Sequence, residues 1–198
     1  MTPMIARGRS LPAAFCLLLA ATSPAVSSPA EIAPSREISL EYQVKAAFIL
    51  NFVRFVEWPP PADGAPGRPL EILVLGNSPI DEPLQETLRG QTVMGRPLTV
   101  TRIEGNDRVD GCHILFIGRS ESPRLDEILK RLQGRCILTV GEAEGFAEAG
   151  GVINFTAEQN KVRFEINPDA AQRAGLRISS KLLSLARIVK DGAQPGGD

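Results

Sequence analysis

Short apolar runs alternate with amphipathic segments through the middle of this chain. The runs are rich in Leu, Ile and Val, which is typical of buried β-strands. The predicted strands are residues 70–75, 98–103, 112–117 and 136–140. Residues 79–88 and 123–132 have helical spacing, the second with Ser122 as a cap. The pattern therefore predicts an α/β fold in which helices flank both faces of a mostly parallel sheet, a three-layer arrangement like the Rossmann and flavodoxin folds.

A longer helix is predicted before this alternating region, over residues 39–56. Ser39 can cap its start, and the proline run that begins at Pro59 ends it. Its apolar face is broad and carries more apolar surface than packing against one side of a sheet requires.

After the last predicted strand, apolar and polar residues alternate at 152–155 and 162–166, with 158–161 as a turn. This pattern predicts a C-terminal antiparallel hairpin at the edge of the sheet. Asn167 then caps a short helix that ends at Gly175, and Ser179 caps a final helix that runs to Val189.

The first residues have the pattern of an export signal rather than of a folded element. Arg7 and Arg9 form a basic segment, residues 11–21 are apolar, and small residues lead to a predicted cleavage site near Ser27. The apolar stretch is short for a membrane span, and an uncleaved membrane anchor is the alternative. We expect a periplasmic protein with a signal peptide at 1–27, a disordered leader at 28–38, a single domain at 39–190 and a flexible tail at 191–198.

Cleavage near Ser27 removes two positive charges and no acidic residue from a chain whose formal net charge is -1. The remaining domain is mildly acidic and has a length that fits one hydrophobic core. No basic stripe indicates a nucleic-acid partner, and no second apolar stretch indicates a membrane span.

Two cysteines remain after cleavage, Cys112 and Cys136, each at the start of a predicted strand. If these strands are parallel neighbours, the cysteines lie at the same end of the sheet, within reach of a disulfide. An oxidising compartment favours the bond, which would stabilise the domain by about 3–4 kcal/mol. The alternative is two buried free thiols.

Polar residues follow two of the predicted strands at the ends where open parallel sheets bind ligands. Asn77 and Ser78 follow the first strand, and Arg119 and Ser120 follow the third. These four residues are candidates for holding a small polar ligand. The alternative is ordinary turn chemistry, because such turns use Gly, Asn and Ser in any case.

Sequence signatures of common enzyme sites are absent. No Gly-x-Gly-x-x-Gly follows the first strand, no Walker lysine is present, and no Gly-x-Ser-x-Gly elbow accompanies the single histidine, His113. One histidine and two cysteines that could pair with each other do not easily build a zinc site. We expect no catalytic residue, no metal and no cofactor, and we interpret His113 as structural.

Arg163 and Glu165 alternate with apolar residues in the second strand of the predicted hairpin. If Phe164 is buried, both charged residues face outward. They then either protect an edge strand or contact a partner protein. Trp58, the only tryptophan, either plugs the end of the first helix or is an exposed interface anchor, and Arg177 is a further candidate for partner contact.

Two long motifs carry a family resemblance. Near the N-terminus, residues 44–52 read VKAAFILNF and residues 55–59 read FVEWP. Near the C-terminus, the segments are GGVINF at 150–155, VRFEIN at 162–167 and AGLRISSKLL at 174–183. Together they resemble the signatures of the YfiR/HmsC family, and the resemblance extends from about Tyr42 to Val189.

The resemblance implies a periplasmic protein that represses an inner-membrane diguanylate cyclase by docking on its periplasmic sensor domain, which lowers cyclic di-GMP and biofilm formation. It also implies release by an outer-membrane partner that sequesters the repressor, and it suggests a homodimer. The residues alone support only an exported α/β domain without a catalytic arrangement. A periplasmic small-ligand-binding protein, or an exported enzyme that uses the strand-end loops, is therefore the alternative hypothesis.

Overall fold

The computed structural model describes residues 34–60, 68–105 and 109–192, with side chains described from Leu40 onward. The predicted signal peptide and residues 28–33 of the predicted leader lie outside the described residues. Residues 34–38 of that leader belong to the first helix instead. In the predicted tail, Asp191 accepts hydrogen bonds from Asn167 (2.6 Å) and Arg173 (3.0 Å), so this residue is held by the domain.

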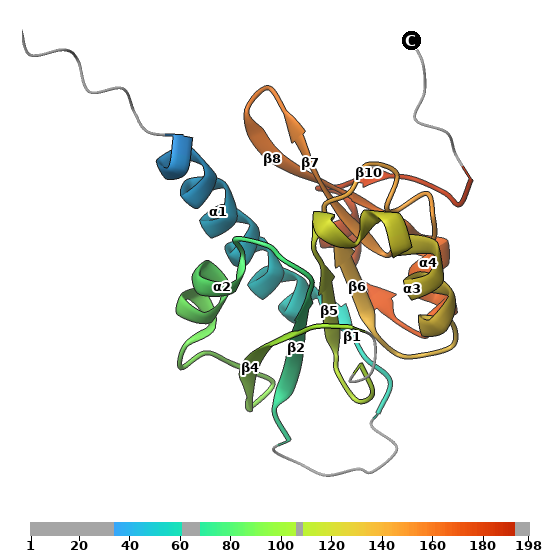
Figure 1. The fold of residues 1–198 in the computed structure, drawn as a ribbon. Helices are drawn as coiled ribbons and strands as arrows, with labels where there is room; N and C mark the ends of the chain where they lie inside the picture. Colours follow the sequence, from blue (N-terminus) through green and yellow to red (C-terminus); the bar gives the residue numbers. More distant parts are fainter. Residues whose placement is uncertain (1–33, 61–67, 106–108, 193–198) are drawn as a thin grey trace, which may run out of the picture. The chain divides into compact units, whose positions relative to one another are not determined.

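In the described part of the chain, the main sheet has the strand order β10-β8-β7-β6-β5-β2-β4-β3 (Figure 1). Its centre is parallel, because Ile72 pairs with Ile114 of one neighbour and with Val100 of the other. The central strands are β4 (Arg96–Ile103), β2 (Leu70–Leu75), β5 (Ile114–Ile117) and β6 (Leu138–Gly141). The predicted parallel strands are confirmed, although β5 and β6 begin later than the apolar runs do. The short β3 (Thr92–Val93) pairs antiparallel with β4 at the edge.

Helices cover both faces of this sheet (Figure 1). On one face, α1 (Pro34–Phe55) and α2 (Asp81–Leu88) share a buried cluster with β2, in which Phe52, Leu84 and Ile72 take part. On the other face, α3 (Leu125–Leu132) packs its Ile128 with alternate residues of the same strands. Continuous apolar runs form these strands because both faces are covered. The predicted α/β fold, a mostly parallel sheet between helices, is confirmed.

Two predicted helix starts are wrong. Helix α1 begins at Pro34, so Ser39 lies inside the helix and does not cap its start. A 3₁₀ helix, η1 (Arg119–Arg124), precedes α3 and contains Pro123. The Ser122 hydroxyl there donates to the carbonyl oxygen of Arg119 (2.7 Å) and does not cap α3. Short polar segments of this kind satisfy their own backbone groups locally, which the helical spacing alone does not reveal.

The predicted hairpin is confirmed as β7 (Ile153–Glu158) and β8 (Lys161–Ile166). Gln159 and Asn160 form its two-residue turn with φ of 49° and 58°, the positive angles that a type I′ hairpin turn needs. The hairpin joins the sheet through the parallel pairing of β7 with β6. It is not the sheet edge along its whole length, because β10 (Arg187–Ile188) pairs with the last two residues of β8.

The C-terminal region differs from the predicted long helix. Asn167 caps α4 (Pro168–Arg173) as predicted, with its Oδ1 accepting from the N–H of Ala170 at 3.0 Å. Ser179 also caps a helix, but α5 (Ser180–Leu183) is a single turn. The chain then turns into β10 alongside β8. Between the two helices, β9 (Arg177–Ile178) pairs with β1 (Val56–Glu57) in a separate two-stranded sheet.

The connections after β2 and β5 leave the sheet toward opposite faces. The chain passes from β2 to α2 on the face that α1 covers, and from neighbouring β5 to α3 on the other face. Such a switch point between adjacent parallel strands opens a crevice at their carboxyl ends, where ligands bind in many open α/β sheets. The carboxyl ends of β2 and β5 are therefore a candidate position for a functional site.

Candidate functional site

A buried ion pair joins α1 to the carboxyl end of the sheet. Nζ of Lys45 lies 2.7 Å from Oε2 of Glu142, which directly follows β6, and 2.6 Å from Oε1 of Glu41 on the preceding helical turn. Lys45 is 4% exposed and Glu142 is 3% exposed. Because either charge would be costly to bury alone, the pair holds α1 to the end of β6.

The surroundings of Lys45 keep its side chain charged. Burial alone lowers the pKa of the ammonium, but the hydrogen bonds to Glu142 and Glu41 outweigh burial and raise the pKa above its ordinary value. The Tyr42 ring lies 4.4 Å from Nζ and adds a cation–π contact. Burial and the negative charge of Glu142 raise the pKa of the Tyr42 hydroxyl. At neutral pH the lysine and the tyrosine both carry their protons, so neither is a ready nucleophile or base.

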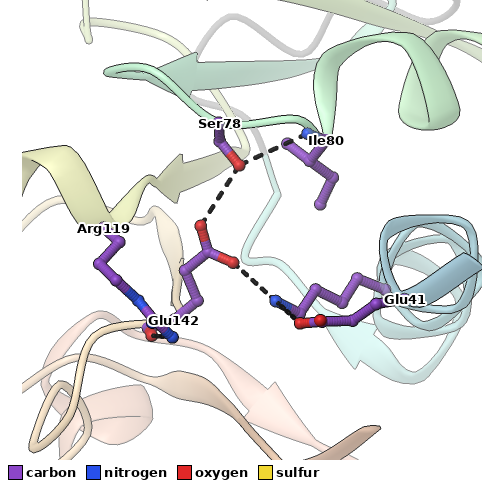
Figure 2. Close-up of polar contacts among 6 residues, drawn as sticks. Glu41, Ser78, Ile80, Arg119 and Glu142 are labelled. Carbon is purple, nitrogen blue, oxygen red and sulfur yellow. Dashed lines mark hydrogen bonds and ion pairs between the residues drawn. The ribbon is translucent and has the colours of Figure 1, made fainter. Parts of the chain in front are cut away.

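Two strand-end loops converge on Glu142 from the other side (Figure 2). The Ser78 hydroxyl donates to Glu142 Oε1 (3.3 Å) and accepts from the N–H of Ile80 (3.4 Å). Arg119, in the segment after β5, donates from Nη2 to the backbone carbonyl oxygen of Glu142 (3.3 Å). The loops after β2, β5 and β6 are thus tied together at one residue.

Asn77 and Ser120 tie the first two of these loops directly. The N–H of Asn77 donates to the Ser120 hydroxyl oxygen at 2.9 Å. Gly76 precedes this contact with a φ of +86°, and a Cβ on it would lie 2.5 Å from the Ser120 oxygen. Glycine is therefore needed here for both the backbone angle and the close approach.

The structure thus brings together all four predicted ligand candidates, Asn77, Ser78, Arg119 and Ser120. Ser78 and Arg119 bond to Glu142, and Ser120 accepts from the N–H of Asn77. The side-chain oxygen of Asn77 accepts from Nη2 of Arg102 at 3.4 Å, so each candidate already has a partner within the protein. Lys45 and Glu142 were missed by the sequence reasoning. The available signal was that Lys45 lies four positions before Ile49, on the buried face of α1, where an unpaired lysine would be costly.

The two charged residues of β8 do not both face outward, so that prediction is wrong. Arg163 is exposed near the hairpin turn, and its Nε lies 3.7 Å from Oε2 of Glu158. Glu165 is 2% exposed, and β10 pairs alongside β8 at this position, with Arg187 opposite Glu165. Arg187 of β10 forms an ion pair with its Oε1, and Asn154 Nδ2 donates to its Oε2 at 3.3 Å. These contacts compensate the burial of the carboxylate.

A hollow of about 600 Å³ lies between the hairpin and the C-terminal segment, lined by Glu158, Arg163, Leu185 and Arg187 among others. We name it the β8 groove. Leu185 is 67% exposed there. The outer edge of β8 at residues 161–164 has no strand neighbour in the described part of the chain. An unpaired edge beside exposed apolar and cationic side chains has the make-up of a protein-binding surface.

Trp58 and Arg177, the other two candidates for partner contact, lie near the two-stranded sheet and not at the β8 groove. Trp58 is half-buried against the core, and its Nε1 donates to the carbonyl oxygen of His113 at 3.3 Å. This position fits the alternative in which Trp58 plugs the end of the first helix, and not the one in which it is an exposed interface anchor. Arg177 extends from β9 with an 87% exposed side chain, and its Nε lies 3.8 Å from Oε2 of Glu57.

Cys112 and Cys136 are free thiols in the structure, not the predicted disulfide. The two residues precede neighbouring strands at equivalent positions, because Ile114 pairs with Leu138. However, the Cys112 side chain packs into the buried cluster on the α3 side. Cys136 is exposed, and its Sγ lies beside Gly175, at 3.6 Å from the place of a Cβ there. A shared strand end therefore does not bring the two sulfur atoms together.

Two further properties concern membrane and metal binding. No helix in the described residues combines the length and apolar character needed to cross a bilayer. In the same residues, no three or more His, Cys, Asp or Glu side chains gather as they would around a metal ion.

Among solved structures, the chain is similar to the crystal structure of an ABC domain in complex with L-Trp from Streptococcus pneumonia. The TM-score is 0.47 at 10% sequence identity, over 77% of this chain and 60% of that one. The chain thus spans about 60% of the length of that solved structure.

A comparison with protein families gives a match over most of the chain. The model of the DUF4154 family, described as YfiR/HmsC-like, matches residues 42–187. The matched region begins within α1 and ends at the first residue of β10, so it includes the buried ion pair and most of the β8 groove. The chain therefore belongs to the YfiR/HmsC-like family, whose members are periplasmic regulators of diguanylate cyclases.

Proposed function

We propose that this protein represses an inner-membrane diguanylate cyclase by binding the periplasmic sensor domain of the enzyme, which lowers cyclic di-GMP and biofilm formation. The family match over residues 42–187 carries the proposal. It extends over the central sheet and the helices on both of its faces, so it supports a regulatory role for the domain as a whole rather than for a shared fragment.

The β8 groove is the surface we assign to docking. It combines three features that suit a protein partner: an unpaired strand edge, the exposed Leu185, and two arginines at its rim. A partner segment that adds to the edge of β8 would gain backbone hydrogen bonds, and its apolar side chains would cover Leu185. Arg163 pairs with Glu158 and Arg187 with Glu165, so the groove offers both signs of charge to a partner segment.

The two predicted contact residues of β8 then have different roles. Arg163 is exposed and can touch the partner directly. Glu165 is buried and acts through Arg187, whose guanidinium it holds at the rim of the groove. Arg177, exposed on β9 near Trp58, is a second candidate contact outside the groove.

Repression of this kind acts by a population shift. The protein changes cyclase activity only if it binds the inactive state of the sensor domain more tightly than the active state. An outer-membrane partner that competes for the same surface would release the cyclase. A homodimer would present two such surfaces, which increases the effective affinity for a dimeric cyclase.

The alternative, a small-ligand binder at the strand-end loops, has weaker support. A ligand between Ser78 and Arg119 would have to displace contacts that the protein already makes with Glu142. It would also have to leave the buried charges of Lys45 and Glu142 compensated, which only a ligand with matching charges could do.

The first test is a pull-down from membranes of cells that express a cyclase with a periplasmic domain. The exported form of the protein is the bait, and mass spectrometry identifies what it retains. Recovery of a membrane protein with periplasmic and cyclase domains supports the proposal, and the absence of any cyclase contradicts it. Arg163→Ala should recover less cyclase, whereas Arg131→Ala, which changes an exposed arginine of α3, should recover as much as the wild type.

A further inference from the structure

The end of the sheet opposite the Lys45–Glu142 pair holds a second cavity. Its volume is about 700 Å³, which lies within the range of small-molecule sites. It is built by the segments that precede β5 and β6, by the start of β4, and by the residues after β1. We name it the amino-end cavity, because it lies at the amino ends of the parallel strands.

Basic side chains outnumber acidic ones in the described lining of the amino-end cavity. Arg68, Arg96 and Arg135 line it, and Asp110 is the one carboxylate among the described lining residues. Asp110 forms an ion pair with Arg135, so these two charges largely cancel. Arg96 then supplies a positive charge that no carboxylate of the described residues pairs with, and such a charge attracts small anions.

Arg96 is held in a fixed position without being neutralised. Its Nε donates to the carbonyl oxygen of Arg68 (2.6 Å) and its Nη2 donates to that of Pro69 (3.2 Å). Nη2 also lies 2.9 Å from Nε2 of His113. No carboxylate of the described residues forms an ion pair with Arg96, and its Nη1 makes no hydrogen bond within them. A pre-positioned guanidinium with unused N–H groups is suited to binding a carboxylate or phosphate.

An aromatic wall completes the cavity. Trp58 lines it, and its ring meets the His113 ring edge to face at a centroid distance of 6.4 Å. The hydrogen bond from Trp58 Nε1 to His113 fixes the indole. Cys112 also lines the cavity, and burial raises the pKa of its thiol to about 12, so the thiol adds no negative charge that would repel an anion.

We propose that the amino-end cavity binds a small organic oxyanion whose carboxylate or phosphate group pairs with Arg96 and whose apolar body packs against Trp58. The site is distinct from the β8 groove and from the crevice around Glu142. It gives the protein a small-molecule input that is independent of the cyclase contact.

The only tryptophan of the chain lies in this cavity, so its fluorescence reports occupancy directly. The purified protein is titrated with benzoate and phenyl phosphate, and with benzyl alcohol as a neutral probe of similar shape. Each is added up to about 10 mM, a concentration that detects the weak dissociation constants of ligands of this size. We expect a saturable change with at least one of the two anions, and the one that binds more tightly identifies the preferred acidic group. No saturable change with either anion, or equal affinity for benzyl alcohol, overturns the proposal.

Variants separate specific binding from quenching at the surface. Arg96→Gln should weaken the anion by about tenfold or more, because a charge-assisted hydrogen bond is lost. Arg135→Gln should also weaken it, because Asp110 is then left unpaired at the cavity. Arg131→Gln on α3 is the matched control and should bind as the wild type does. Thermal unfolding of each variant shows that the fold is retained, and unchanged affinity in folded Arg96→Gln and Arg135→Gln contradicts the site.

Discussion

Nζ of Lys45 and Oε2 of Glu142 lie 2.7 Å apart inside the protein, although 97 positions separate them in the chain. The pair connects the first helix to the loop that follows the fourth strand of the parallel core. Apolar packing of α1 alone would allow the helix to slide along the sheet, because apolar contacts have little directional preference. The ion pair fixes its register.

Removing one partner of this pair should be strongly destabilising. Lys45→Met would leave the Glu142 carboxylate buried without its ammonium partner and should lower the free energy of unfolding by about 3–5 kcal/mol. Urea denaturation measures the loss. Lys130→Met, which changes an exposed lysine of α3, should stay within about 0.5 kcal/mol of the wild type. The double variant Lys45→Met/Glu142→Leu should lose less than Lys45→Met alone; an equal or larger loss would contradict this account.

The raised pKa of Lys45 predicts how stability changes at alkaline pH. In the folded state the pKa lies above the ordinary value of 10.5, so the stabilising effect is fully present below pH 10.5 and is lost as the pH rises through the folded value. Unfolding measured from pH 9 upward should therefore show a steeper loss for the wild type than for Lys45→Met.

Tyr42 titrates in the same range, and its pKa is also raised. The comparison is therefore made in a Tyr42→Phe background, which removes that contribution from both proteins. Parallel pH profiles for the two proteins would show that Lys45 is not held as the structure indicates.

The parallel core could be predicted because its signals are local. Residues 70–75 form β2 with the predicted boundaries, since a short apolar run that ends in a glycine has few other structures available. The turn at Gln159 and Asn160 and the cap at Asn167 were predictable for the same reason. Each depends on the conformation of a few adjacent residues.

The predictions were wrong where the local structure depends on residues that are distant in the sequence. Leucines 182, 183 and 185 have helical spacing, but the chain leaves the helix after Leu183 and places Arg187 beside the buried Glu165. No local pattern indicates that this carboxylate is buried, because alternation with Phe164 predicts that it faces solvent. In the same way, Cys112 and Cys136 have matching positions along the strands, and only the packing on each face determines where their side chains point.

Arg163→Ala and Glu165→Ala should differ in stability. Arg163 is exposed, with an ion pair to Glu158, which is exposed too, so its loss should change the free energy of unfolding by less than about 0.5 kcal/mol. Glu165→Ala leaves Asn154 without an acceptor in the core and should cost about 1–3 kcal/mol. Chemical denaturation of both variants measures the difference, and equal stabilities would place the Glu165 side chain in solvent.

The two thiols should differ in reactivity. Cys136 is exposed and should react with a thiol reagent in the native protein at pH 8, whereas the buried Cys112, with a pKa raised to about 12, should react only after unfolding. Mass spectrometry of labelled protein, purified from the periplasm without reductant, locates the modification. Cys136→Ser should remove the native labelling. If neither cysteine reacts in unfolded wild-type protein before reduction, the two form the disulfide that the sequence suggested.

The tight packing of Phe146 predicts a steric effect at Gly151. Phe146 is fully buried, and a Cβ on Gly151 would lie 2.1 Å from its ring. Gly151→Ala should therefore destabilise the protein by about 1–3 kcal/mol through overpacking, as urea denaturation would show. Phe146→Leu should reduce this cost, because a smaller side chain leaves room for the new methyl group.

Gly134→Ala provides the contrast for that measurement. Gly134 has a φ of +74° and nothing within 4 Å of a Cβ, so its substitution strains the backbone without a clash and should cost about 1 kcal/mol. Phe146→Leu should leave this cost unchanged. If it relieves both substitutions equally, or neither, then contact with the Phe146 ring is not what requires glycine at position 151. If it relieves Gly151→Ala alone, the close approach of backbone and ring is the cause, because only that variant places a methyl group against the ring.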